Sequence, residues 1–304
     1  MKSTGPIASL EQWPELPYTA WKDTLDTLHM TVQIVGKVRL SLTPFEPQWA
    51  NVPLYLSARG LTTTPMAAAG LIFQIDVDLI DHQVVIATVR GDTRRVPLAA
   101  RPVADFYADF MSNLTALGIH AGFRPIPDEV GDPVPFAEDT VHKTYEPEWA
   151  NRFWSVLSRV DLVLKDHRSR FRGKTSPVQF FWGTFDLANT RFSGRPAAPR
   201  PGAGYIERRG GDAELVCAGF WPGGRSFPQP AFFAYTYPKP EAIEHEVIRP
   251  HEAGWNSALG EFALLYEDVR TSASPEEEIL QFCESTYAAG ARLRGWDPGL
   301  VAER

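Results

Sequence analysis

The chain has 304 residues, of which 44% are hydrophobic and 22% are charged, and its formal net charge is −7. An acidic chain lacks the basic surface that phosphate binding needs, so nucleic acid is not expected as a main partner. No apolar run approaches the roughly 20 residues that cross a bilayer, and the N-terminus lacks the apolar segment of a signal peptide, so we expect a cytoplasmic protein without membrane partners.

The first predicted element is a helix over residues 18–40 that carries one narrow polar stripe. At about 100° per residue, the polar side chains of this stripe fall within an arc of roughly 80°. They are Lys22, Asp26, His29, Gln33 and Lys37. A helix that is apolar around most of its circumference is usually buried, so the stripe faces either solvent or a polar cavity.

Strand and turn patterns follow this helix. We expect strands over residues 51–60, 71–79 and 84–89, a turn at Asp81-His82, and a turn at Gly91-Asp92 before a short segment over 94–98. Residues 103–117 have helical spacing, and Gly118 ends that helix. Residues 119–124 have the pattern of a further strand.

A segment rich in proline and acidic residues, 125–139, is the expected boundary between two parts of the chain. Beyond it we expect a helix over 148–170, strands over 177–187, 213–220 and 231–237, and a long loop over 195–212. A last helix begins after Ser274, since Pro275 and Glu277 follow it in the spacing of a capping box.

These elements predict an α+β fold of mostly antiparallel sheets covered by long helices. The order of helix, strands and helix occurs twice, as α-β(3-4)-α in residues 1–130 and 131–304, which we expect to pack as one unit. Gly36-Lys37 and Gly173-Lys174 lie at comparable places in the two halves. An internal duplication explains this match, and the alternative is that the order is common and the match is chance.

Several motifs resemble an uncharacterised bacterial family known only as a domain of unknown function. The motifs are Thr27-Leu-His29, Gln33-Ile-Val-Gly-Lys-Val-Arg-Leu40, Phe180-Phe-Trp-Gly183, Thr190-Arg-Phe-Ser-Gly-Arg195 and Ala218-Gly-Phe-Trp-Pro-Gly223. The resemblance covers nearly the whole chain. It implies a soluble bacterial protein and supplies no mechanism.

The polar stripe is the first candidate for chemistry. His29, Gln33 and Lys37 stand one helical turn apart, and Asp26 lies one turn below His29. A carboxylate beside an imidazole fixes its tautomer and raises its basicity, as a general base needs. The alternative is a solvated helix face with a Lys22–Asp26 pair.

The aromatic strand is the second candidate. Strict alternation over 181–188 places Trp182, Thr184 and Asp186 on one face, while Gly183 indicates close approach of another group. A carboxylate among apolar neighbours needs a partner, for which Arg191 and Lys37 are available. A structural ion pair and a functional carboxylate are equally consistent with the pattern.

Metal and nucleotide sites have little support in the sequence. The seven histidines are scattered, and Cys217 and Cys283 have neither metal-like nor redox-like spacing, which fits a reducing cytoplasm. Glycine-rich loops of the nucleotide-binding types and the Gly-x-Ser-x-Gly pattern do not occur. We therefore predict no metal ligands and no nucleotide cofactor. A metal site assembled in three dimensions around His29 and other cofactors are left open.

Two hypotheses remain. In the first, the protein is an enzyme or small-molecule binder for a polar or anionic compound, with a pocket between helix 18–40 and strand 178–188, His29 as acid/base and Asp26 or Asp186 as its partner. The predicted ligand-binding residues are Gln33, Lys37, Arg39, Arg59, Trp182, Arg191, Trp221 and Tyr235. The alternative for Trp221 and Tyr235 is plain core packing, which is the commoner role of such aromatic residues. In the second hypothesis, the protein is a non-catalytic interaction or scaffold module that uses its proline-rich loops.

Overall fold

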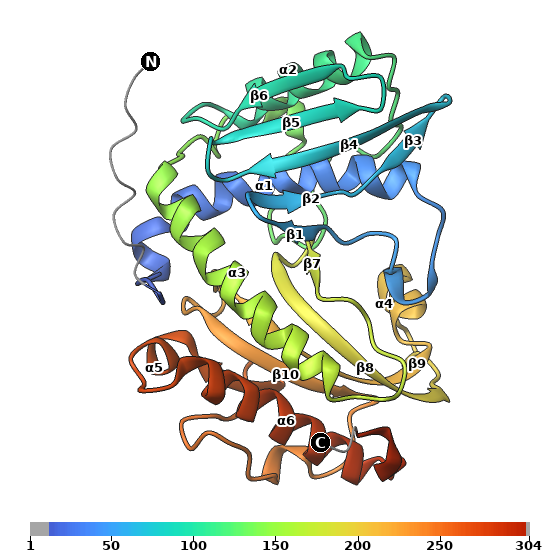
Figure 1. The fold of residues 1–304 in the computed structure, drawn as a ribbon, viewed down its shortest axis with the longest axis vertical. Coiled ribbons are helices and arrows are strands. Elements are labelled where there is room, and N and C mark those ends of the chain that lie inside the picture. Colours follow the sequence, from blue (N-terminus) through green and yellow to red (C-terminus); the bar gives the residue numbers. More distant parts are fainter. Residues whose placement is uncertain (1–11, 302–304) are drawn as a thin grey trace.

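Two six-stranded antiparallel sheets and the surrounding helices form the fold of the computed structural model, which describes residues 12–301 (Figure 1). The predicted α+β class is therefore confirmed. The helices are α1 (Tyr18–Leu42), α2 (Val103–Ala116), α3 (Pro147–Ser169), α4 (Tyr205–Gly210), α5 (Tyr266–Arg270) and α6 (Pro275–Leu293). Short 3-10 turns lie at η1 (Pro47–Trp49), η2 (Phe136–Glu138), η3 (Ile243–His245) and η4 (Pro298–Leu300).

The first sheet has the order β1-β2-β4-β5-β6, with β3 paired to β4. Its strands are β1 (Tyr55–Ser57), β2 (Gly60–Thr62), β3 (Met66–Ala68), β4 (Leu71–Asp78), β5 (Gln83–Thr88) and β6 (Thr93–Pro97). The second sheet has the order β11-β12-β10-β9-β8-β7. Its strands are β7 (Gln179–Phe181), β8 (Asp186–Pro196), β9 (Ala213–Trp221), β10 (Ala231–Tyr237), β11 (Gly254–Asn256) and β12 (Glu261–Leu265).

The two sheets meet edge to edge at one backbone bridge. The N–H of Leu54, just before β1, donates to the carbonyl of Phe180 in β7, and the reverse bond is also made, each at 2.9 Å. Side chains of both halves belong to one hydrophobic core. Trp21 of α1 packs on Phe153 of α3, which stacks on Phe185 with ring centroids 5.4 Å apart.

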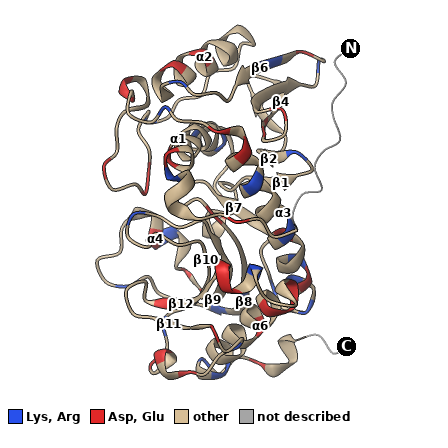
Figure 2. Cartoon of the chain, turned by 90° about the vertical axis from the view of Figure 1, so that its left-hand side faces the viewer, with Lys and Arg blue, Asp and Glu red and all other residues tan. Residues whose placement is uncertain are grey.

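The second sheet has two different faces. Helices α3 and α6 pack on one of them, where Gly290 of α6 lies against Thr236 of β10. Because side chains alternate along a strand, the neighbours of Thr236 point to the opposite face. That face carries Cys217, Tyr235 and Tyr237. In Figure 2, α4 lies to the left of β10 and α3 to its right, so the two faces of the sheet look to opposite sides of the view.

The expected strand over 177–187 is wrong, because the chain reverses inside it. Residues 182–185 form a tight turn between β7 and β8, with Phe185 at a positive φ of 63° and its N–H bonded to the carbonyl of Phe181 at 2.7 Å. Phe181 therefore pairs with Asp186 across a hairpin. The turn breaks the alternation that placed Trp182 and Asp186 on one face.

Several other expected elements differ from those in the structure. The predicted strand over 119–124 is not a strand, and the single strand expected over 51–60 is the hairpin of β1 and β2. The expected loop over 195–212 contains the end of β8 and the helix α4. Ser274 is the N-cap of α6, but its side chain makes no capping hydrogen bond. Strands β11 and β12 were not predicted.

Both halves contain a long helix, an antiparallel sheet and a further helix. Each sheet has six strands rather than the three or four expected. The duplication itself stays a hypothesis, and so does the division at residue 130. Among the helices described, none is long and apolar enough to cross a membrane.

Candidate functional site

The C-terminal part of the polar stripe of α1 faces inward and is covered by the chain itself, whereas Lys22 and Asp26 at its start are partly exposed. Gln33 is fully buried and Lys37 is 3% exposed. The Gln33 amide donates to the carbonyl of Asp128 at 2.7 Å and accepts from the N–H of Asp128 at 3.0 Å. Lys37 forms an ion pair with the carboxylate of Asp128 at 2.6 Å. These contacts fix the 125–139 segment on the helix.

His29 faces the turn between β7 and β8. Its Nε2 lies 3.0 Å from the carbonyls of both Trp182 and Gly183, and carbonyls only accept, so this nitrogen carries the proton and donates. Burial lowers the pKa of His29 to about 4, so the ring is neutral at pH 7. Asp26 pairs with Lys22 at 2.7 Å. The role of His29 as an acid/base stays a prediction.

Aromatic side chains fill the space between α1 and the 182–185 turn. Trp182 lies directly on Gly36, is 3% exposed and donates its indole N–H to the carbonyl of Val52 at 3.1 Å. The ring of Phe185 lies 4.6 Å from that of His29. Close approach at Gly183 was expected, and the group that approaches is the side chain of Glu129. Residues of the protein therefore occupy the space between α1 and the 182–185 turn.

Replacing the buried Gln33 by methionine is expected to lower the free energy of unfolding by about 2 kcal/mol, because the half-buried N–H and carbonyl of Asp128 lose their partner. Urea unfolding measures the loss, and hydrogen exchange should increase over 126–130. Gln281→Met, at an exposed position on α6, is the control. If the two substitutions lower the free energy of unfolding equally, Gln33 does not hold the 125–139 segment on α1.

Asp186 is buried, and neither of the basic side chains predicted to pair with it, Lys37 and Arg191, does so. Its carboxyl accepts a hydrogen bond from the Thr184 hydroxyl. Burial raises its pKa to about 7, and the charge of Glu129 adds to the effect. The predicted partners are engaged elsewhere, Lys37 with Asp128 and Arg191 with Glu284. Asp186 is thus a buried carboxyl that titrates near neutral pH.

Arg191 belongs to a buried cluster on the helix-covered face of the second sheet. It is fully buried and donates to both carboxylate oxygens of Glu284 in α6, at 2.9 and 3.1 Å. His167 of α3 donates to the same carboxylate at 2.9 Å. The guanidinium also lies between the rings of Phe171 and Tyr287, at 5.2 and 4.5 Å. This arrangement joins α3, β8 and α6, which is a structural role.

Two further predicted ligand-binding residues, Arg59 in the turn between β1 and β2 and Arg39 in α1, have their partners in or beside the first sheet. Arg59 pairs with Asp78 and Asp81 at 2.7 Å each. Arg39 is buried, donates to the carbonyl of Thr63, and lies 5.6 Å from the ring of Tyr55. The structure therefore brings together His29, Gln33, Lys37 and Trp182. It does not bring Arg59 or Arg191 to them.

The free face of the second sheet holds a different cluster of titratable groups. Cys217 lies directly between Thr190 and Tyr235 in the strand register. Glu261 precedes Phe262, the partner of Ala234, so its side chain shares this face. Burial raises the pKa of the Cys217 thiol to about 12 and that of the Glu261 carboxyl to about 7. The pKa of Tyr235 is raised by Cys217 and by burial.

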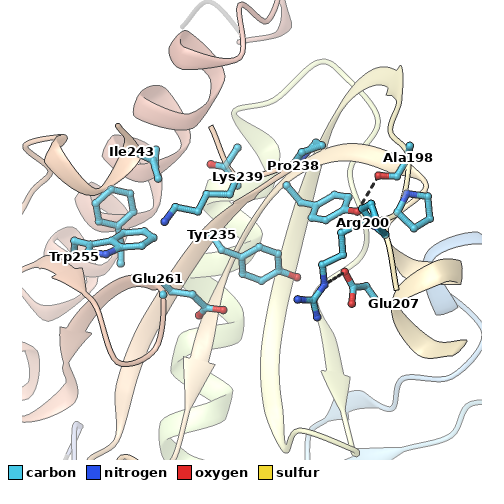
Figure 3. Close-up of a pocket in the computed structure, with 15 residues that line it drawn as sticks. Ala198, Arg200, Glu207, Tyr235, Pro238, Lys239, Ile243, Trp255 and Glu261 are labelled. Atoms are coloured by element: carbon cyan, nitrogen blue, oxygen red, sulfur yellow. Dashed lines mark hydrogen bonds and ion pairs between the residues drawn. The ribbon is translucent and has the colours of Figure 1, made fainter. Parts of the chain in front are cut away.

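A cavity of about 690 Å³ opens over this face. Strands β10 and β12 form its floor, Trp255 and Ile243 form one wall, and the segment before α4 forms the other (Figure 3). Its lining residues are Ala198, Pro199, Arg200, Pro201, Glu207, Tyr235, Thr236, Tyr237, Pro238, Lys239, Ile243, Trp255, Gly260, Glu261 and Phe262. Of the residues predicted to bind ligand, only Tyr235 lines it. Trp221 instead stacks on Phe227, with ring centroids 6.3 Å apart.

The charged groups of the cavity differ in how they are paired. Arg200 pairs with Glu207 at 2.5 Å. Lys239 lies 3.6 Å from the Glu244 carboxylate and 4.6 Å from the centre of the Trp255 ring. The half-buried Glu261 side chain has neither an ion pair nor a hydrogen bond within residues 12–301. It is therefore free to contact a ligand.

Several of these residues gave little signal in the sequence. Gly260 followed by alternation of Glu261 and Ala263 with Phe262 and Leu264 is a strand pattern, and it places Glu261 on the face opposite the apolar Phe262 and Leu264. Arg200, Lys239 and Trp255 lie in loops or short strands without such a pattern. No group of three or more potential metal ligands occurs in the described part of the chain.

A family model described as "Family of unknown function (DUF5996)" matches residues 13–303. No curated protein and no solved structure matches the chain.

Proposed function

This chain belongs to the DUF5996 family of unknown function, and from its own geometry we propose that it binds a small polar organic molecule in the cavity over β10 and β12. The observation that carries the proposal is Glu261, a half-buried carboxyl that has no partner within residues 12–301 and lines a cavity of about 690 Å³. Ligand pockets typically have volumes of about 300–1,000 Å³, with aromatic walls and a few polar groups. Tyr235, Tyr237 and Trp255 supply such walls.

The pocket proposed here differs in place from the one that the sequence indicated. Between helix 18–40 and strand 178–188, Trp182 packs on Gly36 and the polar groups bond to the 125–139 segment. Over β10 and β12, by contrast, aromatic and ionisable side chains border open space (Figure 3). Both cysteines are unpaired and buried, which is consistent with the cytoplasmic location that we propose.

A thermal-shift screen of a metabolite library tests this proposal. Ala198 is exposed on the cavity wall, so Ala198→Trp should fill the cavity from its rim without disturbing the core. Compounds that stabilise the natural protein, by about 2.7 kcal/mol at 100 times Kd, should lose their effect in this variant. Ala100→Trp, at an exposed position outside the cavity, should keep it. The proposal is contradicted if every compound that stabilises the natural protein stabilises Ala198→Trp equally.

The interaction or scaffold function is the second candidate. Phe45, Tyr205 and Ile206 are 47%, 56% and 47% exposed, and Trp49 joins them by ring contacts and a hydrogen bond to the carbonyl of Ile206. However, the guanidinium of Arg209 already covers the rings of Phe45 and Tyr205, at 4.4 and 4.8 Å. We therefore give the small-molecule function more weight.

A further inference from the structure

We infer that the ligand of this cavity carries a small organic ammonium group, held by the carboxylate of Glu261 against the aromatic faces of Trp255 and Tyr235. The inference rests on the proposed function and names the chemical class of its ligand. It departs from the anionic compound that the basic residues of the sequence favoured.

The unmatched charge in the cavity is negative. Arg200 is 75% exposed and paired with Glu207, and Lys239 faces Glu244, so both basic side chains that line the cavity have acidic neighbours. Glu261 has no basic partner among the described residues. An anion would therefore have to compete with protein carboxylates for its contacts. A cation finds a carboxylate that nothing else neutralises.

An ammonium group of the chain itself already occupies part of the cavity. The Nζ of Lys239 lies 4.6 Å from the centre of the Trp255 ring, and Figure 3 shows the side chain reaching across the cavity toward that ring. A cation over an aromatic face is attracted by the electrons of the ring. The Lys239 side chain is 57% exposed, so it is able to leave when another cation enters. The wall therefore has the chemistry to accept an ammonium group.

Binding of a cation should depend on pH through Glu261. Its pKa of about 7 in the free protein means that ionisation rises from about 9% at pH 6 to about 91% at pH 8, a factor of about ten. The charged or titratable groups that face it are Tyr235, Lys239, Cys217, Asp186, Arg200 and Glu207. Asp186 also has a pKa of about 7, so the Asp186→Asn variant measures how much of the pH dependence of binding comes from Asp186.

Three isosteric probes separate the charge of the ligand from its shape: choline, the uncharged 3,3-dimethyl-1-butanol and the anionic 3,3-dimethylbutanoate. Calorimetric titration of the full chain at pH 8 is expected to give at least about fivefold tighter binding of choline than of the neutral probe. At pH 6, where Glu261 is mostly protonated, the preference should fall toward equal binding of the two probes. Asp186→Asn should keep most of this pH dependence.

Two variants test the named contacts. Glu261→Gln should abolish both the preference for choline and its pH dependence. It should leave the melting temperature at pH 8 unchanged or higher, because Glu261 loses no partner in the described part of the chain. Lys239→Met should tighten choline binding, since it removes a competing cation from the Trp255 face. If the cavity takes an anion instead, Lys239→Met should weaken binding of the butanoate.

The outcomes distinguish this inference from the proposed function. Equal binding of the three probes, tighter binding of the anion, or no binding of choline overturns the ammonium inference. Library compounds whose effect disappears in Ala198→Trp would then still support a small-molecule pocket. Two results together would contradict the proposed pocket as well as the ammonium inference. In the first, Ala198→Trp changes the thermal shift of no library compound. In the second, choline binds the Glu261→Gln variant as tightly as the natural protein.

Discussion

Replacing Glu284 by glutamine is expected to lower the free energy of unfolding by about 3 kcal/mol, because it removes the counter-charge of a fully buried arginine. Arg191 would keep its bond to the carbonyl of His167 and its two ring contacts, but no carboxylate would remain beside it. Urea unfolding at pH 7 measures the change. Glu277→Gln, at an exposed position on the same helix, is the control and should change stability by less than about 0.5 kcal/mol.

The same cluster predicts the sign of a pH effect. His167 and Arg191 hold the pKa of Glu284 at about 2, below its usual 4.5, although burial alone would raise it. A lowered carboxyl pKa contributes stability that is complete above about pH 4.5 and is lost as the pH falls toward 2. Burial lowers the pKa of His167, which also favours the folded state at higher pH. The cost of Glu284→Gln should therefore shrink between pH 5 and pH 3; a constant cost would contradict this account.

Periodicity predicted the long elements of this fold well. Helices α1, α2 and α3 follow from helical spacing of polar or apolar residues, α6 follows from the capping pattern at Ser274, and strand β4 follows from alternation. The reversal at residues 182–185 was not predictable from such spacing, because aromatic residues continue through the turn and Phe185 adopts a positive φ that is rare for its type. Strand pairing, not local pattern, sets the face on which Asp186 lies.

Long-range partners explain why the predicted site was only partly assembled. The pattern of α1 indicated that the stripe faces either solvent or something polar, but it did not identify Asp128, which lies in a proline-rich segment without periodicity. Arg191 was predicted near the stripe, whereas its carboxylate partner lies 93 residues further along the chain. The cavity was missed for the same reason, since α4, β10 and β12 meet only in the folded chain.

The second large effect on stability is expected where Gly36 of α1 packs against Trp182, in the turn between β7 and β8. Gly36→Ala is expected to lower the free energy of unfolding by about 2 kcal/mol, although alanine favours a helix over glycine by about 1 kcal/mol. A Cβ at residue 36 would overlap three atoms of the Trp182 ring. The ring is 3% exposed and bonded to Val52, so it has no free space into which to move.

The sign of the Gly36→Ala effect decides whether this packing holds the two halves together. Thermal and urea unfolding measure it, and Gly122→Ala, where a Cβ meets no atom within 4 Å, is the matched control. Trp182→Phe in the Gly36→Ala background should recover part of the loss, because the smaller ring leaves room for the methyl group, even though the bond to Val52 is lost. A stabilising Gly36→Ala would mean that helix propensity outweighs the contact and that α1 does not depend on close packing with Trp182.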